Sequence, residues 1–245
     1  MSELKVKEKD IVVPGEILAE GMDFLPSNGT YRFKDKILAK KIGIIRTEGK
    51  VLKLIPLSGK YLPKTHDIII GKVTDVNFSG WSLNTNSAYQ AMLSMKDATS
   101  EYIRRGADLT RFYDIGDYIV TQIINVTSQN LIDLTMKGPG LRKLREGRII
   151  SINPHKVPRV IGKQGSMVNM IKQATGCQII VGQNGIIWLQ GNSDGEILAV
   201  KAIKKIEEES HISGLTDKIQ KFLDNNKLTK TGTITKENVI EKVKK

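Results

Sequence analysis

The first 65 residues alternate short apolar runs with residues that favour turns. Apolar runs of strand length lie at positions 11–13, 37–39, 42–45 and 51–55. Pro14-Gly15 and a loop at 25–29 interrupt them with the proline, glycine and asparagine that tight turns prefer. This pattern predicts a small β domain over residues 1–65.

A second group of apolar runs predicts five further strands. The runs lie at 67–76, 81–83, 89–93, 116–126 and 131–135. A less regular stretch at 94–114 separates the third run from the fourth. Five strands in a small all-β unit are typical of an OB-type barrel, which we expect over residues 66–137.

From residue 138 the pattern alternates between α and β. Strands are expected at 148–152, 177–181 and 186–189. Asn153 is expected to cap a short helix, and Ser166 a second helix that ends at Gly176. A last helix is predicted from apolar residues at helical spacing, which are Ile197, Val200, Ile203 and Ile206. The predicted order over 138–213 is β-α-α-β-β-α, and residues 214–245 are expected to form one short helix and a polar tail.

The strongest local motif lies between the first two of these helices. Val160-Ile161-Gly162-Lys163-Gln164-Gly165 places two glycines three positions apart, so backbone N–H groups can approach a phosphate without an intervening Cβ. The next helix points its positive end at the same place, and Lys163 adds a full charge. The motif resembles the GXXG loop of a type I KH domain, which clamps about four nucleotides. A P-loop is excluded, because Gln164 replaces the required Ser or Thr and Val157 the first glycine.

Charge favours the same part of the chain. The 38 Lys and Arg against 26 Asp and Glu give a formal net charge of +12, a surplus that suggests a polyanionic partner. A lysine-rich thermophile proteome would also produce this total. Between residues 137 and 163, however, the only acid is Glu146. We predict phosphate contacts from the basic residues of this segment, which are Lys137, Arg142, Lys143, Arg145, Arg148, Lys156, Arg159 and Lys163.

Further candidates lie in the predicted barrel. Aromatic residues on its early strands could stack on bases, and these are Phe78, Trp81 and Tyr89. Alternation along a strand does not show which face each one occupies, so a core position stays open for all three. The irregular stretch adds three candidate phosphate contacts, Arg104, Arg105 and Arg111. Trp188 and Cys177, in apolar strands, are predicted to be core residues.

Several function classes lack support in the sequence. No apolar run approaches the ~20 residues of a membrane span, and the charged start lacks a signal-peptide centre, so we expect a cytoplasmic protein with no membrane partner. One cysteine and three scattered histidines give no disulfide or zinc site, and no cofactor or metal is expected. A two-metal nuclease site would need a cluster of acids, and the candidates are Asp108, Asp114, Asp117 and Asp133. These acids occupy predicted turns and strand starts, where Asp is an ordinary turn or cap residue.

The order of the units is similar to that of the S-one/KH cap subunits of the archaeal RNA exosome. The resemblance covers nearly the whole chain and includes Val13-Pro14-Gly15-Glu16, Gly29-Thr30-Tyr31-Arg32, an S-one-type barrel and one KH loop at 161–165. It implies three cap copies on a hexameric ring of RNase PH-like subunits, with the N-terminal domain docked on the ring. It also implies neighbouring cap subunits, barrels that line the pore, and adenine-rich single-stranded RNA threaded to catalytic sites on other chains.

Two other functions stay open from the residues alone. One is a free-standing RNA-binding protein without a ring partner. The other is a nuclease that acts alone, which would need a catalytic role for the acids named above.

Overall fold

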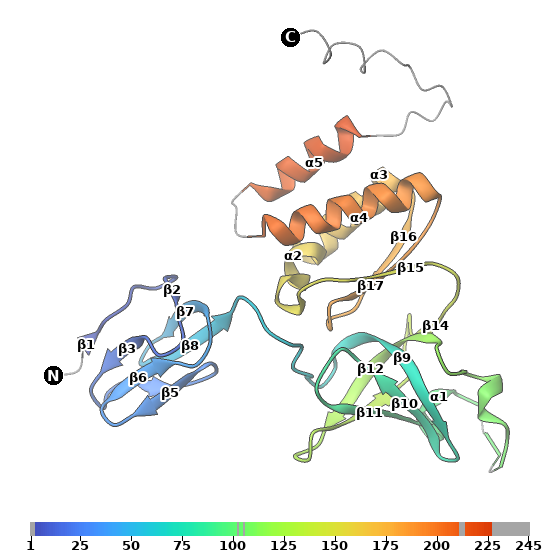
Figure 1. Ribbon diagram of the computed structural model, residues 1–245, viewed down its shortest axis with the longest axis horizontal. Coiled ribbons are helices and arrows are strands. Elements are labelled where there is room, and N and C mark those ends of the chain that lie inside the picture. The colour runs from blue at the N-terminus through green and yellow to red at the C-terminus, as the bar shows by residue number, and fades with distance from the viewer. Residues whose placement is uncertain (1–2, 102, 105, 211–213, 227–245) are drawn as a thin grey trace, which may run out of the picture.

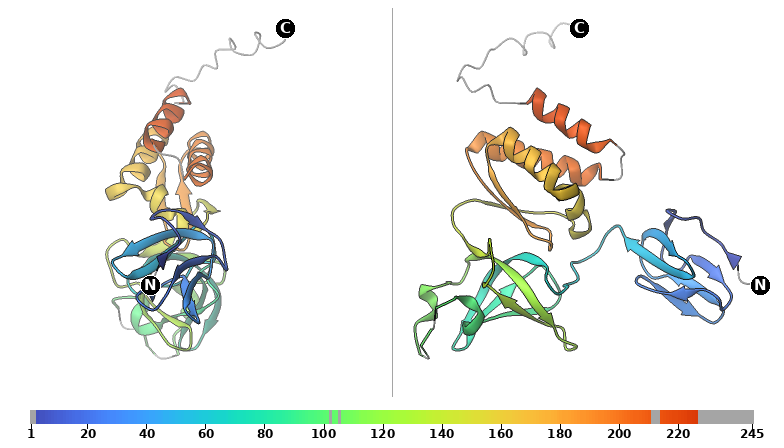
Figure 2. Two further views of the ribbon diagram at one scale, coloured as in Figure 1. Left: turned by 90° about the vertical axis from the view of Figure 1, so that its left-hand side faces the viewer. Right: turned by 180° about the vertical axis from the view of Figure 1, so that it is seen from behind.

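Three structural units follow one another along the chain (Figure 1). The computed structural model describes residues 3–101, 103–104, 106–210 and 214–226. An N-terminal β domain stands to one side, and an α/β unit lies against a β barrel; the same arrangement is visible from behind (Figure 2). The predicted fold class, mainly β followed by α+β, is confirmed.

The N-terminal domain consists of two four-stranded sheets, with strand orders β1-β3-β6-β5 and β2-β7-β8-β4. Its strands are β1 (Glu3–Leu4), β2 (Ile11–Val12), β3 (Ile17–Glu20), β4 (Leu25–Pro26), β5 (Thr30–Phe33), β6 (Lys36–Ala39), β7 (Gly43–Glu48) and β8 (Val51–Pro56). Leu18, Ile37 and Leu52 are fully buried in the shared core. The four predicted runs correspond to β2, β6, β7 and β8, whereas β1, β3, β4 and β5 were not predicted, and β4 occupies the start of the loop expected at 25–29.

The next unit is a closed five-stranded barrel. Its strands are β9 (Ile68–Asn77), β10 (Gly80–Asn84), β11 (Gln90–Ser94), β12 (Tyr118–Val126) and β13 (Leu131–Thr135). Strand β13 closes the circle by pairing antiparallel with β12 and parallel with β11. A short helix α1 (Met95–Ala98) and a 3₁₀ turn η1 (Leu109–Arg111) lie in the excursion between β11 and β12. Strand β14 (Arg142–Leu144) extends the sheet beyond β12. The predicted OB-type barrel is confirmed.

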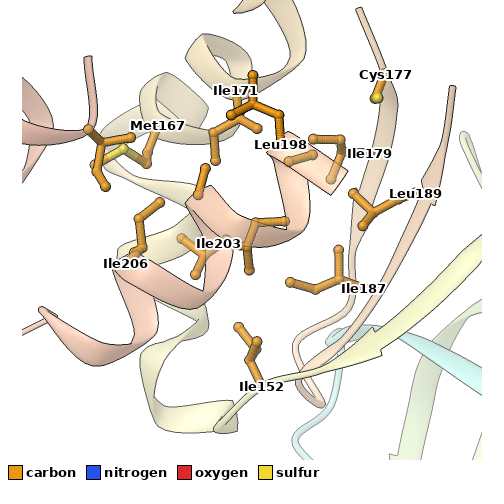
Figure 3. Packing of buried hydrophobic residues seen from close by; sticks show 14 of the residues in the cluster. Ile152, Met167, Ile171, Cys177, Ile179, Ile187, Leu189, Leu198, Ile203 and Ile206 are labelled. Atoms are coloured by element: carbon orange, nitrogen blue, oxygen red, sulfur yellow. The ribbon is translucent and has the colours of Figure 1, made fainter. Parts of the chain in front are cut away.

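The third unit has the predicted β-α-α-β-β-α order. Its elements are β15 (Arg148–Ser151), η2 (Pro154–Lys156), α2 (Val157–Ile161), η3 (Lys163–Gly165), α3 (Ser166–Thr175), β16 (Gln178–Val181), β17 (Ile186–Gln190) and α4 (Ser193–Glu208). The strands form an antiparallel sheet of order β15-β17-β16. Figure 3 shows the apolar side chains of α3 and α4 packed against this sheet. The expected KH fold is confirmed.

Packing of α4 corrects one expectation. Ile203 and Ile206 are fully buried as predicted, but Ile197 is 43% exposed. In a helix of about 3.6 residues per turn, residues three positions apart are about 60° short of a full turn. Three such steps separate Ile197 from Ile206, so the two side chains lie about 180° apart around the helix axis. The face against the sheet is made by Leu198, Ala199, Ala202, Ile203 and Ile206.

Glu207 ties the end of α4 to the start of η2. Its carboxylate accepts the Asn153 N–H at 2.7 Å and a hydrogen bond from Lys204 Nζ at 2.8 Å. Asn153 in turn accepts the His155 N–H at 3.0 Å, which confirms its predicted role as a helix cap. The polar groups at this helix start are therefore satisfied by named side chains.

The hairpin turn between β16 and β17 joins the KH unit to the barrel. Strand β9 extends past its last pair with β10, Lys72 with Asn84, so Ile68 lies beyond the end of β10. The turn at 182–185 reaches this free edge, where the Gln183 N–H donates to the Ile68 carbonyl at 2.9 Å. The turn therefore takes the place that a longer β10 would occupy.

Asn184 completes this junction with its side chain. It is fully buried, and its Oδ1 accepts the Ile70 N–H at 3.3 Å. Its Nδ2 donates to the carbonyls of Ile70 at 2.8 Å and Thr85 at 2.9 Å. A buried apolar cluster shared by both units surrounds these bonds and consists of Ile70, Val120, Leu144 and Trp188.

The linker between the N-terminal domain and the barrel is held at Tyr61. This side chain is 6% exposed and packs in the barrel core. It forms a bridge with Ser87, and its hydroxyl donates to Asp67 at 2.6 Å. Burial and then the Asp67 carboxylate raise the pKa of Tyr61 well above its usual value. Tyr61 therefore packs as part of the barrel, although it precedes residue 66.

After Gly214, α5 (Leu215–Asn225) packs on α3 and α4, on the side of the KH unit away from the barrel (Figure 1). The predicted helix is confirmed, and Lys205 Nζ lies 4.5 Å from the ring centroid of its Phe222. The predicted tail from 227 onward lies outside the described residues. Within the described part of the chain, no helix is long and apolar enough to cross a membrane.

Candidate nucleic-acid interface

The loop between α2 and α3 has left-handed backbone at three of its four positions. The φ angles are 75° at Gly162, 53° at Gln164 and 79° at Gly165. A Cβ at Gly162 would lie 2.7 Å from the backbone nitrogen of Met167, so neither torsion nor space permits a side chain there. A Cβ at Gly165 would meet nothing closer than 3.6 Å, so only the backbone torsion requires glycine at that position.

The N-terminus of α3 opens into this loop. Gly165 is the cap residue, no side chain accepts a hydrogen bond from the first turn, and that turn contains no acid. Ser166, the predicted cap, is instead the first helical residue, because its φ of −57° and ψ of −44° are already helical. The Ser166 N–H donates to the Lys163 carbonyl, but no side chain or acid neutralises the positive end of the helix dipole, which is therefore available to an anion.

Two cations lie at the loop, Arg159 before it and Lys163 within it. Lys163 and Gln164 are exposed at its tip, Arg159 is exposed on α2, and Ile161 packs against the KH core. Neither Arg159 nor Lys163 takes part in any ion pair among the described residues. Both charges remain available for phosphate.

Other cations of the predicted basic segment are engaged within the protein. The contacts are Lys143 with Asp117, Arg148 Nε with Glu196 at 3.5 Å, and Lys156 Nζ with the Glu207 carbonyl at 2.7 Å. An RNA phosphate would have to compete with these partners. The segment is therefore not a uniform row of free charges.

Arg142 and Arg145 lie at the junction of the barrel and the KH unit. The guanidinium of Arg142 lies 5.9 Å from the ring centroid of Trp188, and the Arg145 carbonyl accepts the indole N–H of Trp188 at 3.3 Å. Both arginines are exposed, whereas Trp188 is a core residue as predicted. These two cations form a second group, on elements different from those that carry the KH loop.

The barrel aromatics do not share one surface. Trp81 is fully buried, packs edge to face on Tyr113 with ring centroids 5.2 Å apart, and donates its indole N–H to the Tyr113 carbonyl at 2.8 Å. It cannot stack on a base, so the prediction of an RNA contact is wrong for Trp81. Tyr89 is half-buried against the barrel core. Phe78, in the turn between β9 and β10, is 93% exposed.

The excursion between β11 and β12 carries the remaining arginines. Arg104 is exposed, and Arg111 is exposed with its Nε 3.6 Å from Asp108. Arg105 lies outside the described residues. The excursion therefore presents at least two cations to solvent.

Three of the four acids of the nuclease alternative accept hydrogen bonds in turns, whereas Asp133 is exposed within β13. Asp108 accepts the hydroxyl and N–H of Thr110, and these bonds, with the cation of Arg111, hold the pKa of Asp108 below its usual value. Asp117 accepts the Asp114 N–H at 2.7 Å. Among the described residues, no group of three His, Cys, Asp or Glu side chains could hold a metal ion.

Sequence reasoning missed two features near this surface. The turn at 182–185 was predicted only as a hairpin loop, and its Asn-Gly sequence gave no sign of the contact with β9. Four lysines from the N-terminal domain and linker also gather near the start of α2, although only the Lys40-Lys41 pair is visible as a local charge run.

Comparison with known proteins identifies the family. The KH domain family model matches residues 147–195, from the start of β15 into α4. The exosome complex component Rrp4 of Thermococcus kodakarensis is 42% identical over 247 residues, which cover 99% of this chain and 94% of that protein. The chain belongs to the Rrp4 family of exosome components. Rrp4 of Pyrococcus abyssi is also 42% identical, with 100% of this chain and 92% of the relative covered.

A solved structure supports the same family. A crystal structure assigned to an exosome complex RNA-binding protein matches with a TM-score of 0.63 and 37% identity, and covers 69% of this chain and 97% of that chain. As a member of the Rrp4 family, the chain is an RNA-binding exosome component whose partners are RNA and the exosome complex. The family and its KH domain also support the prediction of a binding protein rather than an enzyme.

Proposed function

We propose that this chain binds single-stranded RNA and delivers it to the central pore of an RNase PH-like hexameric ring for 3′-to-5′ degradation by other subunits. The KH loop carries the proposal. Its left-handed backbone, the uncapped N-terminus of α3 and the free charge of Lys163 all offer positive potential to a phosphate. Phe78, exposed on the barrel, adds an aromatic face for a base.

The N-terminal domain is proposed to dock the ring. Ten of the sixteen exposed large apolar side chains among the described residues lie between Leu4 and Leu62. Apolar side chains concentrated on one small domain are typical of a protein–protein contact. The proposal includes three copies of the chain per ring, contacts with neighbouring cap subunits, a preference for adenine-rich RNA, and a cytoplasmic location.

The KH loop is tested best by changing its tip. The double variant Gly162→Asp with Gly165→Asp would also disturb the backbone, because Gly162 leaves no room for a Cβ. Lys163→Asp with Gln164→Asp keeps both glycines and changes the charge by three units. We expect RNA binding to weaken about tenfold or more, since like charges then face phosphate.

The control has the same charge change elsewhere. Lys50→Asp with Gln129→Asp alters two exposed turn residues of the N-terminal domain and the barrel. Titration of labelled single-stranded RNA with all three proteins, at one salt concentration, compares them directly. Equal affinity for the loop variant and wild type, with both folded, would exclude the KH loop as the RNA site.

Delivery to the ring is tested by activity. The purified chain should not cleave RNA alone, but should stimulate decay by an RNase PH-like ring, because a tethered substrate has a higher effective concentration at the pore. A deletion of residues 1–56 leaves Tyr61 in the barrel and should abolish stimulation, while binding of a short RNA by the KH loop persists. Retained stimulation after this deletion would place the docking surface outside the N-terminal domain.

The same experiments separate the alternatives. A free-standing RNA-binding protein would not co-elute with ring subunits in size-exclusion chromatography. A nuclease would cleave RNA without the ring, and Asp114→Asn or Asp117→Asn would remove that cleavage. Stimulation with adenine-rich RNA that exceeds stimulation with mixed-sequence RNA would support the proposed preference.

A further inference from the structure

A cleft of about 690 Å³ lies where the N-terminal domain faces the start of α2. Its walls come from the N-terminal domain, the linker at Leu62, and the KH residues Pro154, His155 and Pro158. Leu54 and neighbouring apolar residues of β8 form part of the lining. The volume falls within the range of about 300–1,000 Å³ that ligand-binding clefts occupy.

The charge of this cleft is strongly positive. Its lining includes one acid, Asp67, whose carboxylate is already engaged by the Tyr61 hydroxyl at 2.6 Å. None of its lysines forms an ion pair with another described residue, and these lysines are Lys40, Lys41, Lys53 and Lys64. Four ammonium groups without acidic partners, around one hollow, are suited to an anion.

His155 lies within the cleft, close to two of these lysines. Burial first, and then the charges of Lys41 and Lys64, lower the pKa of His155 below its usual value. The two lysines therefore act on a common point inside the cleft. A bound anion would oppose both of these charges.

The cleft and the KH loop lie at opposite ends of one short helix. His155 and Pro158 line the cleft, and α2 runs from Val157 to Ile161, directly before Gly162. At about 1.5 Å per residue this helix is about 8 Å long. That length corresponds to about two nucleotides at the stacked spacing of about 3.4 Å. One RNA strand can therefore reach both places.

We propose that this basic cleft is a second phosphate-binding site for the RNA strand held by the KH loop. This proposal rests on the RNA binding proposed above. The strand leaves the loop along α2 and places its next phosphates among the four lysines. An acidic protein segment is the competing occupant. The most exposed apolar residues of the N-terminal domain, which a protein contact would use, do not line the cleft; they are Ile11, Met22 and Phe33.

RNA length separates the cleft from the loop. Lys41→Ala with Lys64→Ala removes two cleft charges, and Lys34→Ala with Lys50→Ala is a matched control on exposed lysines that do not line the cleft. Binding of a 4-nucleotide and a 12-nucleotide oligoadenylate is measured for the full chain over a range of salt. For the cleft variant we expect unchanged binding of the short RNA, about tenfold weaker binding of the long RNA, and a log–log salt slope smaller by about 1.4.

Proton NMR titration of His155 adds a local measurement. In wild type the long RNA should raise the pKa of His155, because phosphates then oppose the charges of Lys41 and Lys64, whereas the short RNA should not. Wild-type affinity and salt slope for the long RNA in the cleft variant would overturn the proposal. Loss of ring binding with RNA affinity intact would assign the cleft to a protein segment and overturn it as well.

Failure of the KH loop is distinguishable from failure of the cleft. If the wild-type chain does not bind the short RNA, the KH loop is not the primary site. The cleft is then judged by the long RNA alone, with the same two double variants and the same pKa measurement.

Discussion

Truncation of Asn184 should separate the barrel from the KH unit. In Asn184→Ala, the Ile70 N–H, the Ile70 carbonyl and the Thr85 carbonyl lose their hydrogen-bond partner at a fully buried position. A buried polar group left unpaired costs about 1–3 kcal/mol. Taking the lower end for each of the three groups, we expect a loss of about 3 kcal/mol in the free energy of unfolding, roughly a hundredfold in the folding equilibrium.

The adjacent residue provides the control. The side chain of Gln183 is exposed, and only its backbone N–H contributes to the junction, so Gln183→Ala should change stability by less than about 0.5 kcal/mol. Asn184→Asp should destabilise at least as much as the alanine variant. Its carboxylate can still accept the Ile70 N–H but would face two carbonyl oxygens without a proton to donate.

Urea denaturation measures both effects. In a Trp81→Phe background, which leaves Trp188 as the single tryptophan, fluorescence of Trp188 in the apolar cluster at the junction reports separation of the units. Far-UV circular dichroism reports loss of secondary structure. In Asn184→Ala we expect the fluorescence transition to move to lower urea than in wild type. An unfolding free energy within about 0.5 kcal/mol of wild type would refute the assignment of Asn184 as the residue that holds the junction.

Three further predictions concern single features. Phe78→Ala should weaken RNA binding by about 1–3 kcal/mol, the contribution of one stacked base, without changing stability. In contrast, Trp81→Phe should lower the stability by about 1 kcal/mol through its lost hydrogen bond and leave RNA affinity unchanged. Arg142→Ala with Arg145→Ala should lower the log–log salt slope of RNA binding by about 1.4 if both arginines contact phosphate, and an unchanged slope would show that both are only solvated. Burial alone would raise the pKa of Glu207, but the hydrogen bonds and lysine charges around it hold that pKa below its ordinary 4.5. This stabilisation is present above pH 4.5 and is lost as pH falls through the lower folded value, so Glu207→Gln should flatten the acid side of the stability curve measured by thermal unfolding.

The KH loop was predictable because its requirements are local. Left-handed backbone and close approach to Met167 are met by glycines three positions apart, and the helices on either side follow from apolar spacing. The barrel strands were predictable for the same reason, since apolar residues recur along each one and turn residues separate them. Local rules thus predicted most of the elements and one loop.

Orientation and long-range pairing were not predictable. Alternation shows that Trp81 and its neighbours face opposite sides of β10, but the choice of side depends on the Tyr113 carbonyl, 32 positions away. Likewise, Lys143 lies in a basic run, yet its partner Asp117, 26 positions earlier in the sequence, directly precedes β12, the strand with which β14 pairs. A sequence read without tertiary contacts cannot distinguish a free cation from an engaged one.

The junction through Asn184 also has a consequence for synthesis on the ribosome. Asn184 follows Ile70 by 114 positions, and at about 5–20 residues per second this separation corresponds to roughly 6–23 seconds of translation. During that time the edge of β9 presents N–H and carbonyl groups without their final partner, and such an edge can pair with strands of other nascent chains. Fragments that stop before the β16–β17 hairpin should therefore aggregate, whereas the complete chain closes its own edge.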